Sequence, residues 1–128
     1  MVMMAKVAAG GQSGSRALER SPIDRVHLAR YTLGNLDLEI EILGLFARQA
    51  PETLAQLRAA KTEKAWRDAA HTLKGSARAV GAGRVGDCAA RAEPLGPADE
   101  AVRRAAIEVL SAALEDATAY IDGLSNQS

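Results

Sequence analysis

Residues 62–83 read TEKAWRDAAHTLKGSARAVGAG, and this stretch decides the fold that we expect. Its apolar side chains recur every three or four residues, which places them on one face of an α-helix. This core-facing series is Trp66, Ala69, Leu73, Ala77 and Val80, with Ser76 at its edge. Thr62 can cap the start of the helix, and Gly81-Ala82-Gly83 supplies a tight reversal at its end.

The opposite face of the same helix centres on His71. Its helical neighbours, at spacings of three, four and seven residues, are Arg67, Lys74, Gly75 and Arg78. Glycine costs a helix interior roughly 1 kcal/mol relative to alanine, so Gly75 indicates a need for open space beside His71. A neutral imidazole is a good nucleophile near pH 7, and Lys74 and Arg78 can neutralise an anion placed on it. The simpler alternative is a surface histidine among solubilising charges.

The composition limits the class of protein. The 128 residues carry 16 Lys plus Arg and 16 Asp plus Glu, so no basic field indicates nucleic acid or a membrane surface. A single cysteine excludes an internal disulfide, and no apolar run approaches the roughly 20 residues of a membrane span. We expect a cytoplasmic monomer with a flexible segment at residues 1–20 and one domain at residues 21–125.

Further helices are expected on both sides of the central one. A short leading helix should start at Ser21-Pro22, run through Ile23, Val26 and Tyr31, and stop near Gly34-Asn35. A long helix should follow, with a bend or break at Pro51. Its predicted apolar series is Leu36, Ile40, Leu43, Ala47, Ala50, Leu54 and Leu57.

Two helices are expected after the glycine turn. The buried side of the first should be Val85, Cys88, Ala89 and Ala92, before Pro94. The second should bury Val102, Ala106, Val109, Ala113 and Tyr120, widened by Ile107, Leu110, Leu114 and Ile121. The predicted fold is all-α: an antiparallel, up-down-up-down four-helix bundle with a short leading helix.

Part of the first long helix is apolar more than halfway round. Either a further helix covers this surplus, or it is exposed for a partner. We expect a docking patch made of some of four residues and rimmed by Arg67, Lys74 and Arg78. These candidates are Leu38, Ile42, Leu45 and Phe46. Glu39 and Glu41 are expected on a solvated face, and His27 is expected to be structural.

The segment AHTLKGSARAVGA, residues 70–82, resembles the signature of histidine-containing phosphotransfer (HPt) domains. In that family the histidine is followed by lysine three residues later and by glycine four residues later. His71 matches the phosphorylated histidine, Lys74 and Gly75 match the following pair, and Gly81-Ala82 matches the turn. The alanine-rich helix after the turn departs from the family pattern.

The resemblance implies a phosphorelay intermediate of two-component signalling, which carries a phosphoryl group on His71 between aspartates of receiver domains. The sequence has neither a nucleotide loop nor an acidic cluster for magnesium, so we expect a phosphocarrier rather than an enzyme with its own ATP site. Magnesium is expected on the partner receiver, and no cofactor on this chain. Two alternatives remain: a non-catalytic adaptor or inhibitor that binds a receiver or kinase, and a phosphoacceptor fragment of a hybrid sensor kinase.

Overall fold

The computed structural model describes residues 21–127, and within that range it contains helices and no strand. The helices are α2 (Arg25–Thr32), α3 (Leu36–Ala59), α4 (Glu63–Ala79), α5 (Gly83–Ala92), the short 3₁₀ helix η1 (Glu93–Leu95) and α6 (Glu100–Gln127). The flexible segment predicted at residues 1–20 lies outside the described residues.

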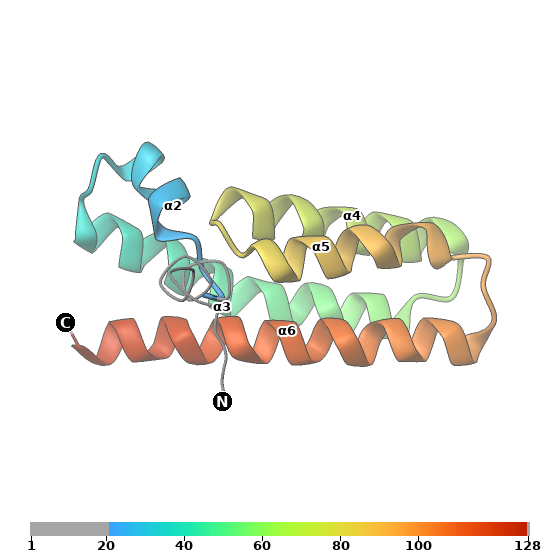
Figure 1. Ribbon diagram of the computed structural model, residues 1–128. Helices are drawn as coiled ribbons and strands as arrows, with labels where there is room; N and C mark the ends of the chain where they lie inside the picture. The colour runs from blue at the N-terminus through green and yellow to red at the C-terminus, as the bar shows by residue number, and fades with distance from the viewer. Residues whose placement is uncertain (1–20, 128) are drawn as a thin grey trace, which may run out of the picture.

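Four helices form the body of the molecule. Helix α3 packs on α4 and α6, and α5 packs on the same two helices, so that the four enclose one core. Consecutive helices run in opposite directions along the bundle, and α2 stands beside the start of α3 (Figure 1). The prediction of an all-α helical bundle with a leading helix is confirmed. No helix within residues 21–127 is long and apolar enough to cross a membrane.

Helix α4 follows the sequence prediction closely. The Thr62 hydroxyl accepts a hydrogen bond from the Ala65 amide and thereby caps the first turn. All five predicted core residues are buried: Trp66, Ala69, Leu73, Ala77 and Val80. The indole Nε1 of Trp66 donates to the carbonyl oxygen of Ala92 at 2.7 Å, which fixes α4 to the end of α5. The predicted buried side of α5 is also confirmed, from Val85 to Ala92.

The prediction for α3 was right in type and partly wrong in phase. Helix α3 continues through Pro51 without a break, so the break allowed for at this proline is absent. Leu36 is 49% exposed, whereas Phe46 is only 4% exposed and belongs to the core. Glu39, expected on a solvated face, is 5% exposed, because its carboxylate accepts hydrogen bonds from Arg25 and Thr32 of α2.

The leading helix differs most from expectation. Asp24, and not Ser21, caps it: the Asp24 carboxylate accepts from the His27 amide, and the helix begins at Arg25. Val26 and Tyr31, two of the apolar residues through which the leading helix was predicted to run, are 67% and 66% exposed. Within α2, Leu28 and Thr32 fill the inward positions instead. The ring of His27 packs edge-on against that of Tyr31, with centroids 5.4 Å apart.

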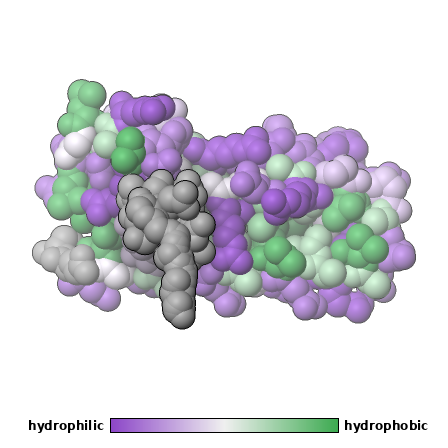
Figure 2. All heavy atoms as spheres, in the orientation of Figure 1, coloured by the Kyte–Doolittle hydropathy of each residue, from purple (hydrophilic) through white to green (hydrophobic). Residues whose placement is uncertain are grey.

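Helix α6 forms as a single long helix, as predicted, but its buried face is rotated relative to the predicted one. Val102 and Val109, predicted as part of the main stripe, are 44% and 54% exposed. The core side consists of Ile107, Leu110, Ala113, Leu114, Ala117 and Ile121. Figure 2 shows the resulting apolar atoms on the surface of α6, and others at the corner where α2 meets α3.

Candidate functional site

The turn between α4 and α5 sets the register of the site. Gly81 has a φ of 82°, a left-handed conformation that glycine adopts without strain. Its carbonyl oxygen accepts a 2.7 Å hydrogen bond from the Asp24 amide, which fixes the turn to the start of α2. Both helices rise about 1.5 Å per residue, so residues equally far from the turn lie side by side. His71 precedes Ala82 by as many residues as Glu93 follows it.

Glu93 is the centre of the hydrogen bonding around His71. The Nδ1 atom of His71 lies 3.1 Å from Oε2 of Glu93, and the Nζ atom of Lys74 lies 2.6 Å from Oε1. The imidazole remains open to solvent, with its side chain 67% exposed, whereas the side chains of Lys74 and Glu93 are each 22% exposed. The carboxylate of Glu93, at the start of η1, therefore contacts both His71 and Lys74 of α4.

The charge on Glu93 decides which nitrogen of His71 is free. The hydrogen bond from Lys74 lowers the pKa of the Glu93 carboxyl, and the hydrogen bond with His71 adds to the effect, while partial burial opposes it. Near neutral pH the carboxylate is ionised and can only accept hydrogen bonds. A neutral His71 must then carry its proton on Nδ1 and donate it to Glu93. The lone pair is left on Nε2, which is the arrangement that a nucleophilic imidazole needs.

Gly75 leaves space next to this imidazole. A Cβ atom built at Gly75 would meet nothing within 4 Å, apart from the backbone of its own helix. The glycine is therefore not required for close packing between helices. At Gly86 of α5 the situation is opposite, because a Cβ atom there would lie 3.0 Å from Cγ of Arg78.

Arg78 and Arg67 were predicted to surround the site, and the structure places them differently from Lys74. The stem of Arg78 packs over Gly86, so this residue crosses onto α5 one turn beyond Gly75. Arg67 is exposed one turn before His71. The part that either guanidinium plays toward a phosphoryl group stays a prediction.

A groove with a mixed polar and apolar lining runs between α3 and α4 beside the His71 face. Its volume is about 360 Å³, and its lining includes Ile42 and Leu45 from α3 and Thr72 and Ser76 from α4. Leu45 is 47% exposed at this groove.

The four docking candidates are therefore not equivalent. Phe46 also lines the groove but is 4% exposed, so its place in the docking patch has to be corrected: it supplies the floor and belongs to the core. Leu38 is 37% exposed and lies outside the groove lining, toward the start of α3.

The sequence analysis missed Glu93. Within the linear sequence it precedes Pro94 and resembles a residue of a helix end. The available signal was the glycine turn, since counting outward from Ala82 pairs His71 with Glu93. Among residues 21–127, His, Cys, Asp and Glu side chains form no group of three or more that could hold a metal ion.

Comparison with protein-family models gives one result that bears on this site. The model described as "Hpt domain" matches residues 41–126, from the early part of α3 to the end of α6, and this range contains His71, Lys74 and Glu93. Comparison with curated proteins and with solved structures gave no match. Because the matched range covers most of the chain, the chain belongs to the histidine-containing phosphotransfer (Hpt) domain family.

Proposed function

We propose that the protein is a phosphorelay intermediate that carries a phosphoryl group on Nε2 of His71 between aspartates of receiver domains. The observation that carries this proposal is the contact between Nδ1 of His71 and ionised Glu93 at 3.1 Å. That contact directs the free lone pair to Nε2 on a side chain that is 67% exposed. Membership of the Hpt family supports a role in histidine phosphotransfer of two-component signalling.

The proposed step is a direct displacement. The Nε2 lone pair attacks the phosphorus of an aspartyl phosphate in line with the departing carboxylate oxygen. An N–P bond forms, the O–P bond breaks, and the aspartate leaves as a carboxylate. The imidazole ring becomes cationic as it is phosphorylated, and Glu93 next to Nδ1–H stabilises that positive charge. Transfer to a second receiver is the same displacement in reverse.

Lys74 and Gly75 have complementary parts in this proposal. The ammonium of Lys74 donates one of its three N–H groups to Glu93, and the other two are available for phosphoryl oxygens. The open space at Gly75 lets an acceptor domain approach within bonding distance of His71. Magnesium, which phosphoryl transfer from aspartate requires for charge neutralisation, is proposed on the receiver.

The groove between α3 and α4 is the proposed docking surface for the receiver. It lies beside Thr72, the residue after His71, and Leu45 offers exposed apolar area at its edge. A relay protein must release each partner, so we expect a small interface, below about 1,200 Å². We propose that the protein is a monomer and that it acts in the cytoplasm, where such receivers act.

The proposal is tested by labelling the protein with a phosphorylated receiver domain and mapping the label. The wild-type protein should acquire an acid-labile, alkali-stable phosphoryl group at residue 71. His71→Gln should abolish it, while the matched variant His27→Gln should be labelled like the wild type. Label retained in His71→Gln would overturn the assignment. Receiver binding by a wild-type protein that acquires no label would favour the adaptor alternative.

The contribution of Gly75 is tested separately. Gly75→Leu should slow phosphotransfer strongly by obstructing the approach to His71. Its stability should be unchanged or higher by up to about 1 kcal/mol, because a helix-interior glycine is replaced where no neighbour is displaced. Normal transfer rates in Gly75→Leu would show that access does not depend on this residue.

A further inference from the structure

The apolar series of α3 does not end where α3 begins. Steps of three and four residues lead from Leu43 back to Leu36, and the same steps continue through Leu33, Ala29 and Val26. A series without a change of phase is typical of a single helix. The periodicity of residues 25–59 is therefore that of one helix, although the structure bends the chain between α2 and α3.

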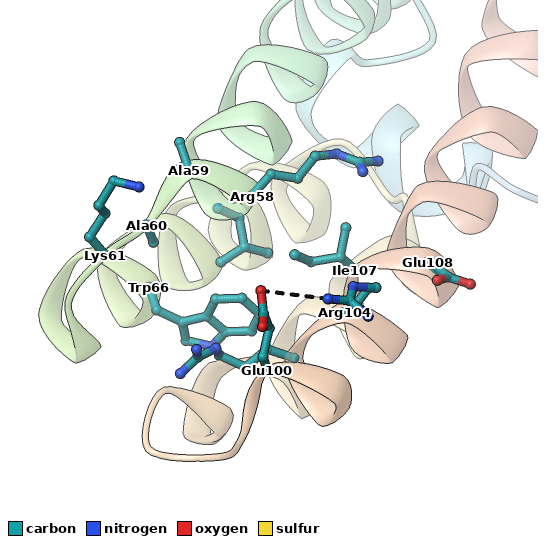
Figure 3. Close-up of a pocket in the computed structure, with 11 residues that line it drawn as sticks. Arg58, Ala59, Ala60, Lys61, Trp66, Glu100, Arg104, Ile107 and Glu108 are labelled. Carbon is teal, nitrogen blue, oxygen red and sulfur yellow. Dashed lines mark ion pairs between the residues drawn. The ribbon is translucent and has the colours of Figure 1, made fainter.

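The two ends of this series are covered very differently. At the far end of α3, Leu57 is 1% exposed, and Trp66 of α4 and Ile107 of α6 line the same pocket (Figure 3). At the near end, Leu33 and Leu36 are 91% and 49% exposed. The bent form therefore leaves apolar area in water at the α2–α3 corner.

The bend itself has an unfavourable backbone conformation. Leu33 has a φ of 55°, and Gly34 follows with a φ of 81°. The left-handed region is unfavourable for a residue that carries a Cβ atom, and the exposed side chain of Leu33 gains no burial in return. Only residues 33–35 separate the two helices, so a change in a few backbone angles would straighten the chain.

Contacts between α2 and the bundle oppose this straightening. Leu28 is 1% exposed, and the hydroxyl of Thr32 donates to Glu39 at 2.9 Å. The Asp24 amide donates to the Gly81 carbonyl oxygen at 2.7 Å. Helix α2 accordingly folds back from the start of α3 toward the α4–α5 turn (Figure 1). Straightening would break all of these contacts, so the bent form is the ground state.

We propose that α2 is a hinged arm, and that a minor form of the protein has residues 25–59 as one straight helix. In this form Leu33 adopts a helical φ, and Val26 and Leu33 continue the line of the buried α3 residues. The Asp24 amide leaves Gly81, and the arm is released without unfolding of the four-helix body. The change does not involve His71, so it stands independently of the proposed phosphotransfer.

Hydrogen exchange of the Asp24 amide measures release of the arm, because this amide is bonded to the α4–α5 turn. Gly34→Ala strains the bend and favours a helix across it, so exchange should be at least about tenfold faster than in the wild type. The Leu43 amide, which reports unfolding of the bundle, should accelerate less. Gly123→Ala is the control, since a Cβ atom there also meets nothing within 4 Å, and its Asp24 exchange should stay within about twofold. Equal acceleration of the Asp24 and Leu43 amides would overturn the proposal.

A proline at the first position of α3 should have the opposite effect. Asn35 has φ and ψ of −72° and 105°, an extended conformation that suits a following proline, so Leu36→Pro is compatible with the bent form. In the straight helix the same proline would clash with the Thr32 carbonyl group. Leu36→Pro should therefore slow exchange of the Asp24 amide by at least about tenfold. Unchanged or faster exchange in a variant that melts like the wild type would show that α2 detaches without forming a continuous helix, and would refute the hinge.

Discussion

The α4–α5 hairpin and the α2–α3 corner obey different rules of burial. In the hairpin, every residue of the predicted α4 stripe is buried and His71 is exposed. At the corner, Val26 and Tyr31 face solvent while Thr32 and Glu39 are buried at 4% and 5% exposure. Hydrophobic periodicity therefore describes the hairpin and misleads at the corner.

The difference arises from what satisfies each buried group. Apolar side chains in the hairpin need only be removed from water, so their spacing alone identifies them. Glu39 is buried because Thr32 Oγ1 donates to it at 2.9 Å and Arg25 contributes a longer contact at 3.5 Å. Both partners belong to α2, so the burial of Glu39 cannot be predicted from the local sequence of α3. Polar burial depends on tertiary partners, and a single-helix pattern cannot contain them.

The largest effect should separate the two regions by core truncation. Leu73→Ala removes a side chain that is 1% exposed and should lower the free energy of unfolding by about 3 kcal/mol. Val26→Ala should change it by less than about 0.5 kcal/mol, because Val26 is 67% exposed. Urea unfolding measures both. Similar losses in the two variants would mean that the corner is packed as tightly as the hairpin.

Two glycines with nearly the same positive φ sharpen the comparison. Gly81 and Gly34 have φ of 82° and 81°, so alanine is strained at both by about 1–2 kcal/mol. Only at Gly81 would the new Cβ atom collide, 2.7 Å from the carbonyl oxygen of Asp24. We expect Gly81→Ala to cost about 2–3 kcal/mol and Gly34→Ala about 1 kcal/mol. Equal losses would show that the link between Asp24 and Gly81 yields without cost.

Removing the buried polar contact at the corner should cause the next largest loss of stability. Glu39→Ala leaves the hydroxyl of Thr32 without its carboxylate partner and should cost about 2 kcal/mol. Glu41→Ala, two residues away on the exposed side, is the matched control and should stay within about 0.5 kcal/mol of the wild type. If the two variants melt together, the bonds to Glu39 contribute no net stability.

The smallest effect tests the ionised centre of the hairpin site. The pKa of Glu93 is lowered in the folded protein from its ordinary value of 4.5, chiefly by Lys74. Its stabilising contribution is therefore fully present above pH 4.5 and disappears as the pH falls through the lowered pKa. Wild type should exceed Glu93→Gln by about 0.5 kcal/mol at pH 6, and the difference should vanish in stronger acid. Thermal melting of both proteins across that range decides it, and a difference independent of pH would contradict it.

The fold was predictable in its essentials because α4, α5 and α6 are amphipathic helices separated by glycine and proline. The existence and order of these helices follow from those signals. The placement of His71, Lys74 and Gly75 on one face of α4 follows from their spacing in the sequence. Phase was less secure where a helix is apolar over a wide arc, as the exposure of Val109 and the burial of Phe46 demonstrate. The start of α2 was misplaced because Ser21-Pro22 resembles a helix start, while Asp24 makes the capping hydrogen bond.

The equal spacing of His71 and Glu93 around Ala82 has a consequence for changes in chain length. One residue inserted between His71 and the turn would rotate the imidazole by about 100° and shift it by about 1.5 Å relative to Glu93. The same insertion would also turn the residues before it out of the core. We therefore expect residues 71–93 to form a segment of fixed length, in which insertions and deletions separate His71 from Glu93 even when both side chains are kept. Variation in length should be tolerated only outside it, at the links after α3 and before α6 or at the outer ends of α3 and α6.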